Sequence, residues 1–293
     1  MSPTQPNHLE ILDKHPCFSP SCPTEHGRIH LPVAPRCNIF CRFCSRGLSV
    51  DVERPGNASR VLSPEEALDI MSLALVLSPE LKVAGVAGPG DPLAGPEALD
   101  TLIAIKEKYP QLITCLSTNG LGLASSMEKI ERAGVQTLTV TVNALDPAIL
   151  QELNLGVLEN GVFLGGRDGA VRLIAAQEEG IRRASEKNLL IKINSVLTPG
   201  INDRHLGQIA ETTQRWGASL MNIIPLIPAH DLAHLPAPTS EELEEAVAAA
   251  EKSLPVKRNC RRCRADACGV PGGVDHAQAL YGELRPQETF SHG

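Results

Sequence analysis

The chain has 293 residues, with 27 Lys and Arg against 34 Asp and Glu, and a formal net charge of −7. This acidic balance argues against nucleic acid or an anionic membrane as the main partner, because both bind basic surfaces. No apolar run approaches the roughly 20 residues that span a bilayer, and the polar amino-terminal run lacks the apolar core of a signal peptide, so we expect a cytoplasmic protein.

Short apolar or β-branched runs alternate with helical patterns along the chain. We expect strands at residues 29–35, 82–87, 112–117, 137–142, 190–196 and 220–226. The capping sequence Ser63-Pro64-Glu65-Glu66 opens one helix, and others are expected near 97–108, 126–133, 170–187, 203–216 and 241–253. The alternation predicts an α/β fold in which helices cross over a mainly parallel sheet.

The most specific motif follows the first expected strand and consists of Cys37, Cys41 and Cys44, spaced Cys-x3-Cys-x2-Cys. Three thiolates on one short loop can hold three irons of a [4Fe–4S] cluster and leave the fourth iron open. The alternatives are a zinc site, a disulfide framework and unconnected core cysteines. Zinc commonly uses two separated Cys-x2-Cys pairs, and cytosolic disulfides are uncommon, so we favour the iron–sulfur cluster.

Polar or glycine-rich loops follow the later strands, at the sheet edge where barrel enzymes place their sites. Glycines allow close backbone approach, an aspartate can accept from an ammonium group, and hydroxyl or amide side chains can bond a ribose or a carboxylate. Each of these residues could equally belong to an ordinary turn or helix cap. The candidates are Gly88, Pro89, Gly90, Asp91, Ser117, Thr118, Asn119, Asn143, Asn194 and Ser195.

The cysteine spacing and the six strand–helix units resemble the radical S-adenosylmethionine (SAM) family. The resemblance implies a partial (βα)6 TIM-like barrel and a [4Fe–4S] cluster whose open iron binds SAM. That cluster would reduce the sulfonium of SAM to give methionine and a 5′-deoxyadenosyl radical, and the polar loops would bind SAM. We expect a single domain over 1–293, with the barrel at 29–235 and extensions at 1–28 and 236–293 that cover the barrel mouth.

Eight runs resemble, in the same order, the NifB family of nitrogenase cofactor maturases: HPCF, RIHLPVAPRCNIFC, ERPG, VAGVAGPGDPLA, CLSTNG, VTVNALDP, KINSVLTPGIND and NCRRCRADA. The resemblance is to the short members, without the NifX-like carboxyl-terminal domain. It implies that the enzyme fuses two [4Fe–4S] clusters, named K1 and K2, around a carbide from a SAM methyl group. With one more sulfur, the product would be an eight-iron cofactor precursor used in nitrogen fixation.

The resemblance assigns Cys17, His30 and Cys115 to K1. A neutral imidazole releases iron more readily than a thiolate does, which suits a cluster that must later be rebuilt. Taken alone, a histidine on an apolar strand is more often a core residue than a ligand.

We assign Cys260 and Cys263, a Cys-x2-Cys pair with basic neighbours, to K2. The alternative, half of a zinc ribbon, lacks a second Cys-x2-Cys pair. Cys22 is the preferred third K2 ligand. Cys268 and His26 are its rivals, although Cys268 could simply be a small apolar residue.

Glu53 and Arg54 follow the cluster loop in the run VERPG, where the family pattern resembles ESRPG. Val52 therefore takes the place of the family glutamate, and Glu53 that of the serine. A carboxylate there could be a transient ligand or a proton relay, whereas a solvated loop charge is the ordinary interpretation.

The resemblance also implies a reduced ferredoxin or flavodoxin as electron donor, and cluster acceptors of the NifX or NifEN type. Two other functions stay open from the residues alone. One is a radical SAM enzyme whose additional cysteines hold auxiliary clusters for a peptide or small metabolite. The other is a non-catalytic iron–sulfur carrier, which would not need the SAM loops.

Overall fold

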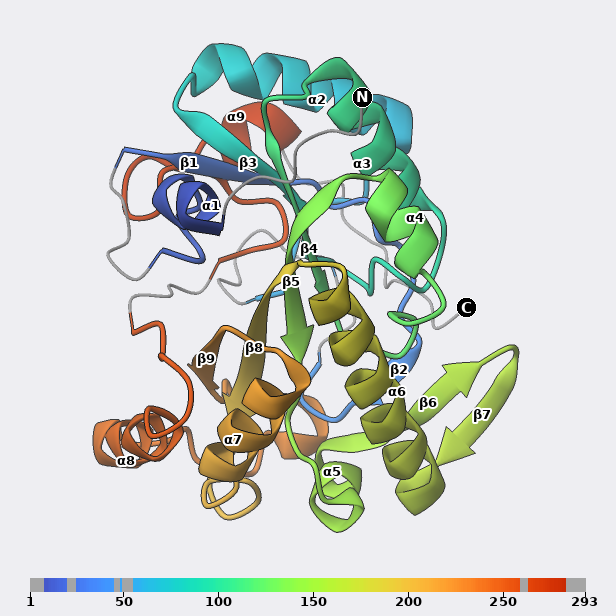
Figure 1. Ribbon diagram of the computed structural model, residues 1–293, viewed down its shortest axis with the longest axis vertical. Coiled ribbons are helices and arrows are strands. Elements are labelled where there is room, and N and C mark those ends of the chain that lie inside the picture. The colour runs from blue at the N-terminus through green and yellow to red at the C-terminus, as the bar shows by residue number, and fades with distance from the viewer. Residues whose placement is uncertain (1–7, 20–24, 45–47, 49–54, 259–262, 283–293) are drawn as a thin grey trace.

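A curved sheet lies at the centre of the molecule, and six of its seven strands are parallel (Figure 1). The computed structural model describes residues 8–19, 25–44, 48, 55–258 and 263–282. The six parallel strands correspond to the six expected ones: β1 (Gly27–His30), β3 (Leu81–Val86), β4 (Ile113–Thr118), β5 (Val135–Thr141), β8 (Leu190–Leu197) and β9 (Leu220–Pro225). A short strand, β10 (Cys268–Gly269), pairs antiparallel with β1 at one edge, and β9 forms the other edge. The curled, open sheet is the expected partial TIM-like barrel.

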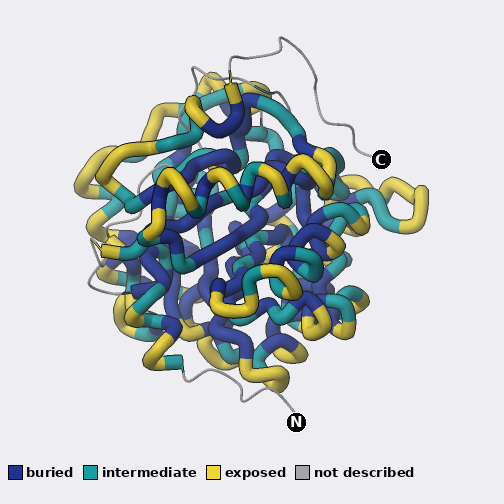
Figure 2. The backbone as a smooth tube through the Cα atoms, turned by 90° about the horizontal axis from the view of Figure 1, so that it is seen from above, coloured by how far each residue is buried: buried dark blue, intermediate teal, exposed yellow. Residues whose placement is uncertain are grey.

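The six helices expected from the sequence cover the convex side of the sheet (Figure 1). They are α2 (Pro64–Leu77), α3 (Glu97–Lys108), α4 (Met127–Arg132), α6 (Gly166–Glu186), α7 (Leu206–Trp216) and α8 (Ser240–Ala250). The capping box predicted at Ser63 is present, since its hydroxyl accepts from the Glu66 amide while the Glu66 carboxylate accepts from the Ser63 amide. Figure 2 shows exposed outer faces on helices around a buried sheet. No helix in the described ranges is both long and apolar enough to cross a membrane.

The first strand is shorter than the sequence predicts, because it ends at His30 rather than at residue 35. Pro32 and Pro35 carry no amide hydrogen and cannot continue a ladder. The Leu31 amide still donates to the Gly85 carbonyl at 2.9 Å, and the chain then leaves the sheet. This early exit carries the backbone directly to Cys37.

A second, three-stranded sheet was not predicted from the sequence. It contains β2 (Ile39–Cys41) and a hairpin of β6 (Asn154–Glu159) and β7 (Val162–Gly165), in the order β2-β6-β7. Asn160 and Gly161 form the turn with positive φ angles of 52° and 76°, the conformation that Asn-Gly hairpins adopt. The hairpin projects from the body beside α6 and pairs with the cysteine loop (Figure 1).

Both extensions pack on the barrel. Helix α1 (His8–Lys14) is followed by Phe18, which lies in one apolar cluster with Val83, Ile113, Leu190 and Leu220. These four residues stand near the beginnings of their strands, so the amino-terminal extension closes the end of the barrel where the strands start. On the carboxyl-terminal side, the Tyr281 hydroxyl donates to the His30 carbonyl at 2.8 Å. The remaining short elements are α5 (Pro147–Leu153), η1 (His230–Leu232) and α9 (Ala277–Tyr281).

Candidate active site

The Cys37–Cys44 loop is fixed by the small sheet. Cys41 belongs to β2, whose residues pair antiparallel with β6, and the amide of Arg42 donates to the Leu153 carbonyl at 3.0 Å. The Asn154 side chain accepts from the Phe40 amide at 3.1 Å, next to Cys41. Ile39 packs with Val157 in a separate apolar cluster, against which Cys37 and Cys41 lie. The small sheet therefore holds Cys37 and Cys41 against this apolar cluster.

The donor set of this loop fits a four-iron cluster. Cys37, Cys41 and Cys44 are half-buried, and none of the three is in a disulfide. Burial raises the pKa of Cys37 to about 12, so the thiol stays protonated until a metal replaces its proton. Among the described residues no three His, Cys, Asp or Glu converge closely enough to hold a single metal ion. A four-iron cluster does not require that convergence, because each cysteine binds a different iron.

The glycine-rich loop after β3 lies against the same cysteine loop. The Gly90 amide donates to Ala34 and the Asp91 amide to Arg36, at 2.8 and 2.7 Å. A Cβ atom at position 90 would lie 2.0 Å from the Arg36 carbonyl oxygen, so only glycine fits there. The close approach of the two backbones places the glycine-rich loop directly beside Cys37.

Asp91 joins two of the predicted SAM-binding loops. Its buried carboxylate accepts from the Asn119 amide at 2.6 Å, the Leu93 amide at 2.8 Å and the Thr118 hydroxyl at 2.9 Å. The Asn119 side chain in turn donates to Asn38 at 2.7 Å. The carboxylate that the sequence offered as an ammonium acceptor is thus engaged by the protein itself, and its role in this geometry is to position the loops.

The remaining polar candidates divide into two groups. Asn143 accepts from the Val196 amide at 2.9 Å, and the Ser195 hydroxyl donates to the Val142 carbonyl, so both side chains join the segment after β5 to β8. Ser117 and Asn194 instead line a cavity inside the barrel. Asn143 and Ser195 therefore stabilise the sheet, whereas Ser117 and Asn194 face the cavity.

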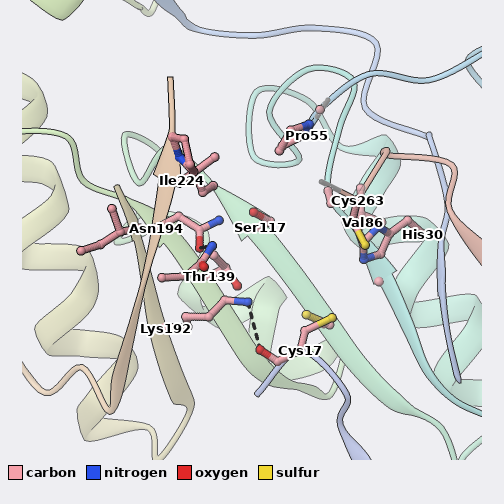
Figure 3. A pocket seen from close by; sticks show the side chains of 17 residues that line it. Cys17, His30, Pro55, Val86, Ser117, Thr139, Lys192, Asn194, Ile224 and Cys263 are labelled. Carbon is pink, nitrogen blue, oxygen red and sulfur yellow. Dashed lines mark hydrogen bonds between the residues drawn. The ribbon is translucent and has the colours of Figure 1, made fainter. Parts of the chain in front are cut away.

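That cavity is lined by the side chains predicted for K1, of which Cys17 and His30 are labelled in Figure 3. Cys17 enters from the amino-terminal extension, His30 from β1 and Cys115 from β4. Cys263, predicted for K2, lines the same cavity. Four potential iron ligands from four distant parts of the chain thus face one internal space.

The sheet register explains how His30 and Cys115 come together. His30 pairs with Gly85 on β3, and Gly85 pairs with Cys115 on β4, so the three residues form one row across the strands. A Cβ atom on Gly85 would lie 3.2 Å from the Cys115 Cβ and 3.6 Å from His30 Cδ2. Glycine in this row leaves an open space between the imidazole and the thiol, of the kind a cluster needs.

His30 is held in the form that binds metal. Its Nδ1 lies 2.9 Å from the Arg264 carbonyl oxygen, which can only accept, so Nδ1 carries the hydrogen. Burial, and secondarily the charge of Arg28, lowers the pKa of His30 to about 4. The ring is therefore neutral at physiological pH, with a free lone pair on Nε2, and this backbone contact is typical of metal-binding histidines.

The candidates for K2 are only partly described. The Arg28 guanidinium donates to Cys263 Sγ at 2.8 Å, although burial raises the pKa of that thiol. Cys268 faces the main apolar core from β10 and does not line the cavity, and His26 does not line it either. The other K2 candidates, Cys22 and Cys260, lie outside the described residues, and so do Val52 and the predicted site residues Glu53 and Arg54.

Sequence reasoning missed Gly85 and Lys192, which line the cavity, and Arg28, which bonds the cavity residue Cys263. Gly85 carries a weak signal, because a glycine inside a strand pattern often marks close approach by another group. Arg28 and Lys192 carry a stronger one, since charged residues within apolar strands are rarely buried without a partner. Both are about 5% exposed.

Replacing Gly85 by alanine should weaken cluster binding in the cavity. The added Cβ occupies the space between His30 and Cys115, and we expect about tenfold weaker iron retention with about 1–3 kcal/mol of destabilisation. Iron analysis after anaerobic reconstitution measures the first effect, and thermal unfolding the second. Gly207→Ala is the matched control, because its Cβ would lie 3.3 Å from Ala249 outside the cavity. Equal iron retention in the two variants would contradict a cluster site in the space that Gly85 leaves between His30 and Cys115.

The fold and the cysteine loop together define a radical SAM enzyme. The family model of the Radical SAM superfamily matches residues 31–213. The structure is similar to a radical SAM methyltransferase from Sphaerobacter thermophilus, with a TM-score of 0.51 over 79% of this chain and 64% of that one, at 19% identity. Membership of the superfamily brings with it one [4Fe–4S] cluster and SAM.

Two relatives identify the branch of the superfamily. The FeMo cofactor biosynthesis protein NifB of Methanocaldococcus infernus is 45% identical over 89% of this chain and 86% of its own length. The NifB of Methanocaldococcus jannaschii is 46% identical over 89% of this chain and 87% of its own length. The chain belongs to the NifB family, and it is a radical SAM enzyme of FeMo cofactor biosynthesis.

Proposed function

We propose that this enzyme fuses two [4Fe–4S] substrate clusters, K1 and K2, with a SAM-derived carbide and one additional sulfur, and so forms an eight-iron precursor. The observation that carries the proposal is the convergence of Cys17, His30, Cys115 and Cys263 on one cavity of a radical SAM barrel. A carrier would not need the radical SAM barrel that surrounds these ligands.

The resident cluster would be held by Cys37, Cys41 and Cys44, and would supply an electron to the SAM sulfonium. One SAM would methylate a sulfide of a substrate cluster, and a second would give the 5′-deoxyadenosyl radical that abstracts hydrogen from this methyl group. Deprotonation then leaves the carbide as K1 and K2 join. S-adenosylhomocysteine, 5′-deoxyadenosine and methionine would be the accompanying products.

The protein's own residues supply placement and exclusion of water. His30, fixed through the Arg264 carbonyl, offers Nε2 to one iron of K1, while Cys17 and Cys115 would bind two others. Cys263, beside the Arg28 guanidinium, would bind K2 together with Cys260. The shared cavity would let the two clusters meet without leaving the protein.

Partners follow from the same proposal. A reduced ferredoxin or flavodoxin would deliver electrons, and proteins of the NifX or NifEN type would accept the product.

The proposal is tested by anaerobic reconstitution, iron counting and incubation with dithionite and methyl-labelled SAM. We expect about twelve irons per chain, the content of three four-iron clusters, and label in an extractable iron–sulfur product. A Cys115→Ala variant should still form 5′-deoxyadenosine but lose the labelled product. If wild-type protein forms 5′-deoxyadenosine and no label enters a cluster, the enzyme has another substrate and the fusion proposal is wrong.

A further inference from the structure

Lys192 is a buried cation whose amino group faces the cavity (Figure 3). Its Nζ donates to the Cys17 carbonyl at 3.2 Å and lies 4.7 Å from the centre of the Phe18 ring. No carboxylate of the described residues forms an ion pair with it, and none lines the described part of the cavity. A buried ammonium without a counter-ion is costly, so an anion inside the cavity would stabilise it.

Hydroxyl groups extend the donor surface beside Lys192. Ser117 on β4 pairs with Thr139 on β5, and Thr139 pairs with Lys192 on β8, so the three residues form one row across the sheet. All three line the cavity. The row next to it carries His30, Gly85 and Cys115. One row can thus bind the irons of a cluster while the other presents an ammonium and two hydroxyls towards its sulfides.

We propose that Lys192, supported by Ser117 and Thr139, is the positioning residue that provides the counter-charge for an iron–sulfur cluster bound by Cys17, His30 and Cys115. The proposal rests on the proposed function, because it takes K1 as the occupant. Each electron added to a cluster increases its negative charge, and cations and hydrogen bonds to its sulfides favour the reduced state. Lys192 would therefore raise the reduction potential of this cluster and slow its loss.

A purely structural role for Lys192 is the competing explanation, since its bond to the Cys17 carbonyl also anchors the amino-terminal extension. The chain contains a matched control for that role. Lys257 is 7% exposed and donates to the Ser19 carbonyl at 2.8 Å, two residues from Cys17, but it does not line the cavity. Lys192→Gln keeps a donor near Cys17 and removes the charge, whereas Lys192→Arg keeps the charge.

The test uses the full chain with Cys37, Cys41 and Cys44 all replaced by alanine, which removes the SAM-binding cluster from the spectra. After anaerobic reconstitution, the signal lost on Cys115→Ala identifies the cavity cluster. We expect Lys192→Gln to shift the midpoint potential of this cluster to a more negative value and to speed iron release to a chelator about tenfold. Lys192→Arg should restore both properties. Lys257→Gln should lower thermal stability and leave the potential unchanged.

Each other outcome is decisive. An unchanged potential in Lys192→Gln, or an equal shift in Lys257→Gln, would overturn the role of Lys192 while leaving the cavity cluster in place. If Lys192→Gln takes up no cluster, restored uptake in Lys192→Arg supports the counter-charge, and failure of both variants overturns it. If the parent with intact Lys192 binds no iron in the cavity, the proposed function itself fails.

Discussion

Replacing Cys41 by alanine is expected to abolish cleavage of SAM to 5′-deoxyadenosine. Cys41 lies in β2 between the other two thiols, and the remaining pair, Cys37 and Cys44, cannot hold three irons. Loss of the cluster removes the electron source for SAM cleavage, so product should fall to the uncatalysed background. Chromatographic detection of 5′-deoxyadenosine after reduction with dithionite measures the effect.

The same variant should keep the iron bound inside the barrel, because Cys17, His30 and Cys115 lie on other elements. Cys268→Ala is the control, since this buried cysteine belongs to the main core and should leave both iron content and SAM cleavage nearly unchanged. Cys41→Ser guards against misfolding, because it preserves the size of the side chain. Undiminished 5′-deoxyadenosine formation in Cys41→Ala would show that the resident cluster lies elsewhere.

The parallel strands were predictable because each is a short apolar run bounded by turn residues, and a βαβ sequence admits few arrangements. The ends of the strands were less predictable. The apolar run of β1 continues to residue 35, but the strand ends at His30 because Pro32 and Pro35 cannot donate to a ladder. The β6–β7 hairpin was missed although Asn160-Gly161 is a strong turn signal, because its strands are short and carry exposed Val162 and Phe163.

The cysteine loop was predictable from spacing alone, whereas the cavity required sheet register. No local pattern shows that His30 and Cys115 share a row, since they are far apart in sequence and meet only through Gly85. The role of Lys192 could not be predicted for the same reason, because its partner, the Cys17 carbonyl, lies 175 residues away in sequence. Asp91 was recognised as a site residue, but its hydrogen bonds to Thr118 and Asn119 depend on how two loops meet.

The Asp91→Asn substitution is expected to destabilise the protein and weaken SAM binding together. Asparagine has nearly the same shape, but one carboxylate oxygen becomes an NH2 group, which cannot accept from the Asn119 or Leu93 amide. A buried donor without an acceptor costs about 1–3 kcal/mol, and more where the lost partner is charged. At about 2–4 °C per kcal/mol, thermal unfolding should occur about 5–10 °C lower.

The loss of SAM affinity follows from the position of Asp91 between the glycine-rich loop and Thr118–Asn119 at the end of β4, both beside the Cys37 loop. Once that link is broken, the Gly90 and Asn119 backbones are free to separate, so the dissociation constant for SAM should rise while the iron of the Cys37 loop is retained. Asp146→Asn is the matched control, because Asp146 accepts from the Ala148 amide at the exposed start of α5. It should lower stability by about 1 kcal/mol at most and leave SAM affinity unchanged. Equal SAM affinity in Asp91→Asn and wild type, at a temperature where both are folded, would restrict Asp91 to fold stability and place the SAM site away from these two loops.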